Sequence, residues 1–116
     1  MAMQTYRAGN RATFTDSGNA TITLTLPAPG AGRAWVIDSM LCHGLGAITV
    51  FKVEVTTNGG TTIAASGGQV VAGERNLFGG IPGPIVTLVN DAPKVVFTAT
   101  GANPAQCTVN AHIENA

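Results

Sequence analysis

The stretch that decides the fold is ATITLTLPAPGAGRAWVIDSMLCHG, residues 20–44. In its first part threonines alternate with isoleucine and leucine, which would give a strand one apolar face and one hydroxyl-bearing face. Pro27 ends this run because proline cannot donate a hydrogen bond to a neighbouring strand. We therefore predict a strand with one buried face over residues 21–26.

A second apolar run follows from Arg33 to Cys42. Strict alternation would put Trp35, Ile37 and Leu41 on one face of this strand. The opposite face would carry Val36, Asp38, Met40 and Cys42. Because both faces are largely apolar, we predict a central strand that is covered on each side by another element or by a neighbouring subunit.

The rest of the chain continues in short segments rich in β-branched residues, separated by glycine and proline. Together with the two runs above, they give about eight predicted strands. The further segments are residues 47–57, 61–65, 69–72, 84–90, 94–100 and 107–114. A change of alternation in the first of them predicts a β-bulge near Val50. Asn58-Gly59 predicts a hairpin closed by a type I′ turn, because Asn and Gly tolerate positive φ.

These segments indicate one all-β domain in a chain of 116 residues. No window repeats apolar residues with helical periodicity. Strands spaced about 8–12 residues apart are typical of an antiparallel β-sandwich, and about eight strands in two sheets favour a jelly roll. An immunoglobulin-like sandwich is the main alternative, but the antibody type places its tryptophan between two cysteines, whereas Trp35 precedes both Cys42 and Cys107.

Charge excludes two classes of partner. Six basic and six acidic residues are scattered singly and sum to zero, so no basic stripe is available for the phosphates of nucleic acid or for an anionic membrane. No apolar run approaches the roughly 18 residues of a membrane span, and the N-terminal residues lack a secretory apolar segment. We expect synthesis in a cytoplasm. With so few charged residues, part of the surface is expected to contact protein.

The cysteines, Cys42 and Cys107, are separated by 65 positions. A disulfide between them would close a long loop and add about 4 kcal/mol on the chain-entropy model. Because a reducing cytoplasm keeps thiols free, the sequence favours two buried thiols instead.

Residues capable of chemistry are few. The pairs Cys42-His43 and Cys107-x4-His112 suggest a zinc site, but residues one or five apart on a regular strand point to opposite faces. The same argument separates Asp38 from Ser39 and His43, so no nucleophilic triad forms. No close pair of acids suited to glycoside cleavage stands out. We therefore predict no enzyme activity, no metal and no cofactor.

Sugar binding is a further alternative, because small β-sandwiches bind sugars through exposed aromatic rings. This chain has one tryptophan and one tyrosine. Trp35 lies in the most apolar strand and is predicted to be a core residue, which leaves Tyr6 as a single candidate ring.

Two segments are candidates for contact with other proteins. The first is an N-terminal arm, residues 1–14, preceding a β-sandwich domain of residues 15–116. The second is the glycine-rich excursion around residues 74–81, which is long for a loop in a compact domain. The predicted contact residues are Tyr6, Arg7, Arg11, Phe14, Arg75, Leu77, Phe78 and Ile81. The alternative for Phe14, Leu77 and Phe78 is that they close the ends of the sandwich.

The polar N-terminal arm, the opening TITLTLPAPGAGRAWVIDSM and the closing strand CTVNAHIEN resemble small β-sandwich proteins of tailed bacteriophage virions, above all head decoration (cement) proteins. The resemblance spans most of the chain and rests on its layout. It implies a jelly-roll homotrimer on the capsid exterior that binds the major capsid protein and clamps neighbouring capsid subunits. Two alternatives stay open, a tail-fibre or receptor-binding module that recognises a host glycan, and a collar or tail component.

Overall fold

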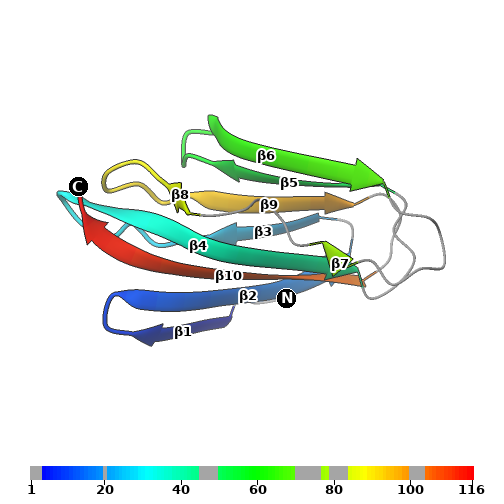
Figure 1. Cartoon of the computed structure of the whole chain (residues 1–116), viewed down its shortest axis with the longest axis horizontal. Coiled ribbons are helices and arrows are strands. Elements are labelled where there is room, and N and C mark those ends of the chain that lie inside the picture. Colours follow the sequence, from blue (N-terminus) through cyan, green and yellow to red (C-terminus); the bar gives the residue numbers. More distant parts are fainter. Residues whose placement is uncertain (1–3, 20, 45–49, 70–76, 79–83, 100–103) are drawn as a thin grey trace.

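The computed structural model describes residues 4–19, 21–44, 50–69, 77–78, 84–99 and 104–116 (Figure 1). These residues form two antiparallel sheets and contain no helix that could cross a membrane. The strands are β1 (Gln4–Ala8), β2 (Arg11–Asn19), β3 (Thr21–Thr25), β4 (Arg33–Gly44), β5 (Val50–Thr56), β6 (Thr62–Gln69), β7 (Leu77–Phe78), β8 (Ile85–Val86), β9 (Lys94–Ala99) and β10 (Pro104–Asn115).

The strand order is that of a jelly roll, as predicted. One sheet has the order β1-β2-β10-β4, with β7 and β8 both pairing with the far side of β4, and the other has the order β3-β9-β5-β6 (Figure 1). From β2 onward the chain changes sheet at every connection except the β5–β6 hairpin and the step from β7 to β8. Two Greek keys in two sheets therefore bury the alternating apolar residues of both.

Trp35 lies at the centre of the core. Its side chain is 0% exposed, and the ring of Phe14 meets it edge to face with centroids 5.6 Å apart. The indole Nε1–H donates to the Pro27 carbonyl at 2.6 Å, which satisfies its polar group inside the core. The prediction that Trp35 is a core residue is confirmed. Phe14, in contrast, was predicted to be a contact residue, and its 1% exposure shows that it is part of the core instead.

A β-bulge in β4 changes the faces predicted for this strand. Asn110 pairs with Ser39 but Ala111 pairs with Ile37, so Asp38 is an extra residue with no partner position on β10. After the bulge the alternation is inverted, and Met40 and Cys42 face the core together with Trp35 and Ile37. The sequence analysis placed Met40 and Cys42 on the face opposite Trp35 and Ile37, because it assumed strict alternation and an inserted residue is not visible in the sequence pattern.

The N-terminal segment is a β-hairpin of the larger sheet, not an extended arm. Ala8 pairs with Arg11 across the two-residue turn Gly9-Asn10, in which Gly9 has φ of 61°. β2 continues along β10, so the predicted domain boundary after residue 14 falls inside a strand. Gly-Asn between alternating residues is a hairpin pattern, but the polar composition of the segment concealed it.

Two turns also differ from the predictions. The β5–β6 hairpin is present, but positive φ occurs at Gly60 and not at Asn58 or Gly59. The Thr57 N–H donates to the Thr61 carbonyl at 2.8 Å, and the Thr57 carbonyl accepts from the Gly60 N–H at 3.0 Å, so the connection is a three-residue loop and not a type I′ turn. The pairing of β5 with β6 shifts register between Val55 and Thr56, where Ile63 of β6 is the extra residue. A β-bulge was predicted near Val50, but Val50 and Phe51 pair regularly with Gln69 and Gly68, and residues 47–49 lie outside the described residues. The strand predicted at residues 69–72 lies outside them too, except for Gln69 at the end of β6.

The strand predicted at residues 84–90 is shorter in the structure. β8 ends at Val86. The N–H and the hydroxyl of Thr87 both donate to the Trp35 carbonyl, each at 3.0 Å. The chain then leaves the sheet at Leu88 and reverses at Asn90, which has φ of 50°. Asn90 accepts the Gly30 N–H at 3.1 Å and thereby ties this turn to the loop before β4.

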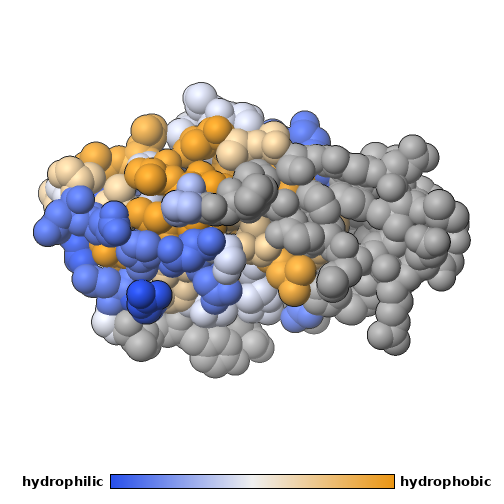
Figure 2. Space-filling model, in the orientation of Figure 1, coloured by the Kyte–Doolittle hydropathy of each residue, from blue (hydrophilic) through white to orange (hydrophobic). Residues whose placement is uncertain are grey.

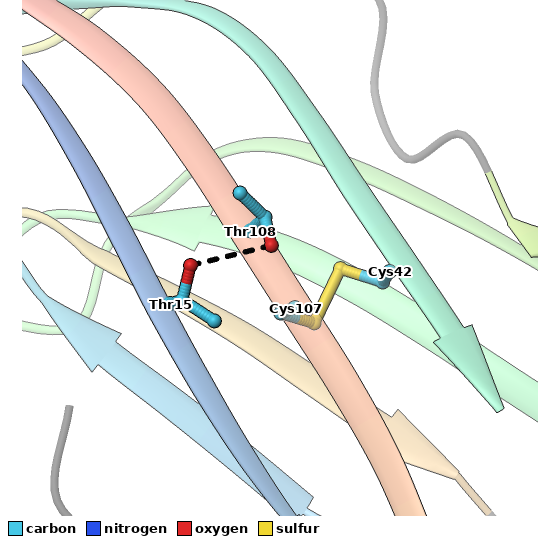
Figure 3. Close-up of a disulfide and its surroundings, with 4 residues drawn as sticks. All are labelled: Thr15, Cys42, Cys107 and Thr108. Atoms are coloured by element: carbon cyan, nitrogen blue, oxygen red, sulfur yellow. Dashed lines mark hydrogen bonds between the residues drawn. A yellow bond between two sulfur atoms is a disulfide. The ribbon is translucent and has the colours of Figure 1, made fainter. Parts of the chain in front are cut away.

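Cys42 and Cys107 form a disulfide, which corrects the expectation of free thiols (Figure 3). They are directly opposite each other on β4 and β10, both 0% exposed, with Cα atoms 4.1 Å apart. The bulge at Asp38 is what turns Cys42 inward to meet its partner. Thr108, the next residue, points to the outer face, where its hydroxyl lies 3.4 Å from that of Thr15.

We expect Phe14→Ala to lower the free energy of unfolding by about 3 to 5 kcal/mol, because it empties a ring-sized volume beside Trp35. Urea denaturation followed by tryptophan fluorescence measures this change. Thr13→Ala, one position away on the outer face, should cost about 1 kcal/mol or less. Equal effects of the two substitutions would contradict the core assignment.

Reduction of the disulfide should lower the free energy of unfolding by about 4 kcal/mol, since the bond restricts a long loop of the unfolded chain. Denaturation with and without dithiothreitol measures the difference. The double variant Cys42→Ala/Cys107→Ala is the control, and its stability should not respond to dithiothreitol. An unchanged stability of the wild-type chain on reduction would show that the pair is not bonded in solution.

Candidate contact surfaces

The outer side of the larger sheet carries a cluster of polar residues, which we call the polar face. Its members come from β2, β4 and β10: Arg11, Thr13, Asp38, Ser39, Asn110, His112 and Glu114. Asn110 is at its centre, accepting from the Thr13 hydroxyl at 2.7 Å and donating to Ser39 Oγ at 3.1 Å. These side chains therefore satisfy one another across three strands.

His112 joins the bulge in β4 to β10. Its Nδ1 is 2.7 Å from Asp38 Oδ2, and its Nε2 is 2.9 Å from Glu114 Oε1. Both nitrogens can donate at once only when the imidazole is protonated. The hydrogen bond to Asp38 first, and that to Glu114 second, raise the pKa of His112 above its ordinary value.

On the polar face, Asp38 and Ser39, which the sequence analysis considered for a catalytic triad, bind other partners. The bulge brings Asp38 and Ser39 to the same face, where they were predicted to be on opposite faces, but Asp38 binds His112 and Ser39 binds Asn110. Cys107 is buried and His112 faces outward, as strand alternation predicted. Among the described residues no three His, Cys, Asp or Glu side chains are arranged to hold a metal ion.

The outer side of the smaller sheet is also polar and internally paired. Lys52 Nζ lies 2.8 Å from Glu54 Oε1, and Thr62 donates to Glu54 Oε2 at 3.1 Å. The hydrogen bond from Lys52, and after it the one from Thr62, lower the pKa of Glu54. Thr21 and Thr23 are exposed on β3 of the same sheet.

One group of exposed apolar residues begins at the end of β8, and we call it the apolar strip: Val86, Leu88 and Val89. They are 65%, 57% and 54% exposed. Figure 2 shows apolar residues gathered toward the β8 end of the molecule, beside the hydrophilic residues of the larger sheet. Apolar side chains grouped in this way on a surface mark a contact site more often than single ones do.

The apolar strip adjoins the polar face through one row of the sheet. Arg11, His112, Val36 and Val86 are paired in register on β2, β10, β4 and β8. Along this row the side chains are polar on β2 and β10 and apolar on β4 and β8. The sequence analysis missed the strip because it assigned residues 84–90 to a strand, although alternation within that segment already placed residues 86 and 88 opposite the buried Ile85 and Thr87.

The predicted contact residues do not lie together. Tyr6 and Arg7 are in β1 at one edge of the larger sheet, whereas Leu77 and Phe78 form β7, which pairs with His43 and Cys42 on β4 beyond β10. Arg11 is exposed on the polar face and Phe14 is buried. Arg75 and Ile81 lie outside the described residues. The two segments are thus on opposite margins of one sheet.

We expect the stability contributed by His112 to be complete at pH values below about 6.5, the pKa of an unfolded histidine. It should be lost as pH rises through the raised pKa of the folded state, because the folded protein then releases a proton that it binds more tightly than the unfolded chain does. NMR titration of the imidazole measures this pKa directly.

Asp38→Asn should lower the pKa of His112 more than Glu114→Gln does, since the bond to Asp38 is the larger cause of the shift. Arg11, directly opposite His112 on β2, is unchanged in both variants. A pKa of His112 that is the same in both variants and in the wild type would contradict the double contact.

No family model and no curated protein matches the chain. Solved structures give remote similarities. The core of the Drosophila protein NLP, a structure that addresses pentamer formation and histone binding, aligns at 17% identity over 91% of this chain and 99% of its own, with a TM-score of 0.49. A CBM4 protein aligns at 10% identity over 97% and 88% of the two chains, with a TM-score of 0.40.

A protein of infectious bursal disease virus, Gx strain, aligns at 14% identity over 97% of this chain and 36% of its own, with a TM-score of 0.27. None of the three TM-scores reaches 0.5. The order of the strands in its own two sheets, and not similarity to these proteins, therefore defines this chain as a jelly-roll β-sandwich.

Proposed function

We propose that this protein is a structural component of a virion, a decoration or cement protein. It binds the outer surface of the capsid, contacts the major capsid protein and stabilises neighbouring capsid subunits. In this proposal it acts as a homotrimer, is not an enzyme and needs no cofactor. Stabilising a lattice requires buried surface and repeated contacts, and many copies on one particle bind with avidity even when each site is weak.

The observation that carries the proposal is the contrast between the two polar sheet faces and the apolar strip. On the two faces Asn110, His112 and Glu54 each already bind two neighbours within the chain, so these groups gain little from a partner. Val86, Leu88 and Val89, in contrast, are more than half exposed, and covering them would be favourable. The body beneath them is a two-sheet core with a cross-strand disulfide, a rigid support for a contact surface.

Recognition of a host glycan has less support. Sugars are bound on exposed aromatic rings, and the Trp35 indole is 0% exposed with its N–H already donated to Pro27. Tyr6 would be a single ring on an edge strand. The resemblance of the sequence layout to phage decoration proteins points in the same direction as the apolar strip.

Cryo-electron microscopy of the virion whose genome encodes this chain tests the location. Density for the jelly roll on the outer capsid, in groups of three, is the expected result. Density in the collar or tail would overturn the proposal of capsid decoration. Native mass spectrometry of the purified protein tests the trimer separately.

Val86→Ser/Leu88→Ser should weaken binding to undecorated capsids by at least about tenfold, because two exposed apolar side chains lose the transfer energy of burial. Co-sedimentation with the capsids measures the affinity. The matched control is Leu41→Ser, an apolar residue 40% exposed on β4 outside the strip, which should bind as the wild type does. Wild-type affinity of the double variant would remove the apolar strip from the contact.

A further inference from the structure

The edges of the larger sheet differ in how they are protected. At one side, β8 has only two residues, Ile85–Val86, and short strands are a common way to prevent pairing between molecules. At the other side, β1 pairs with β2 along all five of its residues without a register shift. It has no proline, lysine or bulge, and no strand of the described residues lies on its far side (Figure 1).

The turn between β1 and β2 determines which backbone groups point away from the sheet. A two-residue turn makes its flanking residues, Ala8 and Arg11, a hydrogen-bonded pair. Pairs then alternate along the hairpin, so Tyr6 and Gln4 also direct their N–H and C=O toward β2. The N–H and C=O of Thr5 and Arg7 therefore point to the open side of the strand.

The neighbouring strands agree with this assignment. If odd residues of β2 bond to β1, its even residues bond to β10, and Cys107, opposite Asp16, directs its backbone to β2. The pair Cys107 and Cys42 must then be of the non-hydrogen-bonded type, which has the closer Cα atoms, and their separation is 4.1 Å. The Ile113 N–H likewise donates toward β2, to the Asn10 carbonyl at 2.8 Å.

We propose that β1 pairs with β1 of a second copy of this chain, antiparallel and about a two-fold axis at Tyr6. In this register Thr5 of each copy lies opposite Arg7 of the other. Each such pair exchanges two hydrogen bonds, so all four outward-pointing groups of each strand are used. The two larger sheets become one continuous sheet across the axis.

A second copy fits this edge because the pairing is self-complementary. An antiparallel strand related to itself by a two-fold axis presents each donor to an acceptor without any match of sequence. The contact is small compared with the roughly 1,000 Å² of a stable interface, so it forms at high protein concentration or where copies are held close together. The inference does not depend on the proposed function, and a two-fold contact can link trimers as well as monomers.

Tyr6→Cys tests the register. The cysteines introduced at position 6 of the two copies would face each other at the axis, within the Cα separation that a disulfide requires, and should cross-link when the concentrated protein is oxidised. Ala8→Cys is the matched control, because position 8 of one copy lies opposite position 4 of the other. We expect at least about tenfold more covalent dimer for Tyr6→Cys on a non-reducing gel. The native cysteines are fully buried and bonded to each other.

Thr5→Pro tests the hydrogen bonds. Proline removes an N–H that points to the open side, whereas Tyr6→Pro would remove one that bonds to β2. Adding Thr5→Pro to Tyr6→Cys should therefore reduce cross-linking by about tenfold while the melting temperature stays unchanged. A mixture of Thr5→Cys and Arg7→Cys chains should cross-link as heterodimers.

Equal cross-linking of the Tyr6→Cys and Ala8→Cys chains would overturn the proposal, and so would cross-linking that Thr5→Pro leaves unchanged. A measurement of capsid binding tests whether a capsid strand, and not a second copy, pairs with the open edge. If Thr5→Pro weakens co-sedimentation with capsids and Tyr6→Cys gives no dimer, the open edge belongs to a capsid strand and not to a second copy.

Discussion

The register of β4 against β10 is the constraint on which the rest of the structure depends. The single extra residue at Asp38 inverts the alternation of β4 between Ile37 and Met40. This inversion turns Met40 and Cys42 into the core beside Trp35 and Ile37, and Cys42 then lies opposite Cys107. It also leaves both Asp38 and Ser39 on the outer face, where Asp38 contacts His112. The inward face of the second half of β4, the disulfide and the contact between Asp38 and His112 thus depend on one register.

The surface divides into parts that are satisfied within the chain and parts that are not. Asn110, His112 and Glu54 each bind two neighbours, so a ligand at these three residues would have to disrupt existing contacts. The apolar strip at the end of β8 exposes apolar area to water, and the open edge of β1 has backbone N–H and C=O groups that no strand of the described residues pairs with. Contact with protein would cover the first and pair the second, and neither contact requires a reacting group. This division is the reason we propose a structural role.

Local alternation in the sequence was sufficient to predict the buried face of a strand where the strand is regular. Thr21–Thr25 alternates between exposed and buried residues as predicted, and the burial of Trp35 and the jelly-roll class followed from similar patterns. The N-terminal hairpin was missed because Arg11–Asn19 is mostly polar, and only Ala12 and Phe14 mark its buried side. The apolar strip was missed for a different reason, since residues 84–90 were predicted to be a strand and its two faces were not distinguished. Composition alone does not show which side of a strand the second sheet covers.

The sequence by itself determined the all-β class, most of the strands and the buried faces of the regular ones such as Thr21–Thr25, because a two-residue period and turn-forming residues act locally along the chain. The tertiary structure alone decided the bulge at Asp38, the bond between Cys42 and Cys107, and the meeting of Asp38 with His112. Each of these depends on the register between two strands distant in sequence. Register is set by how both sheets pack their side chains into one core, and no single segment contains that information.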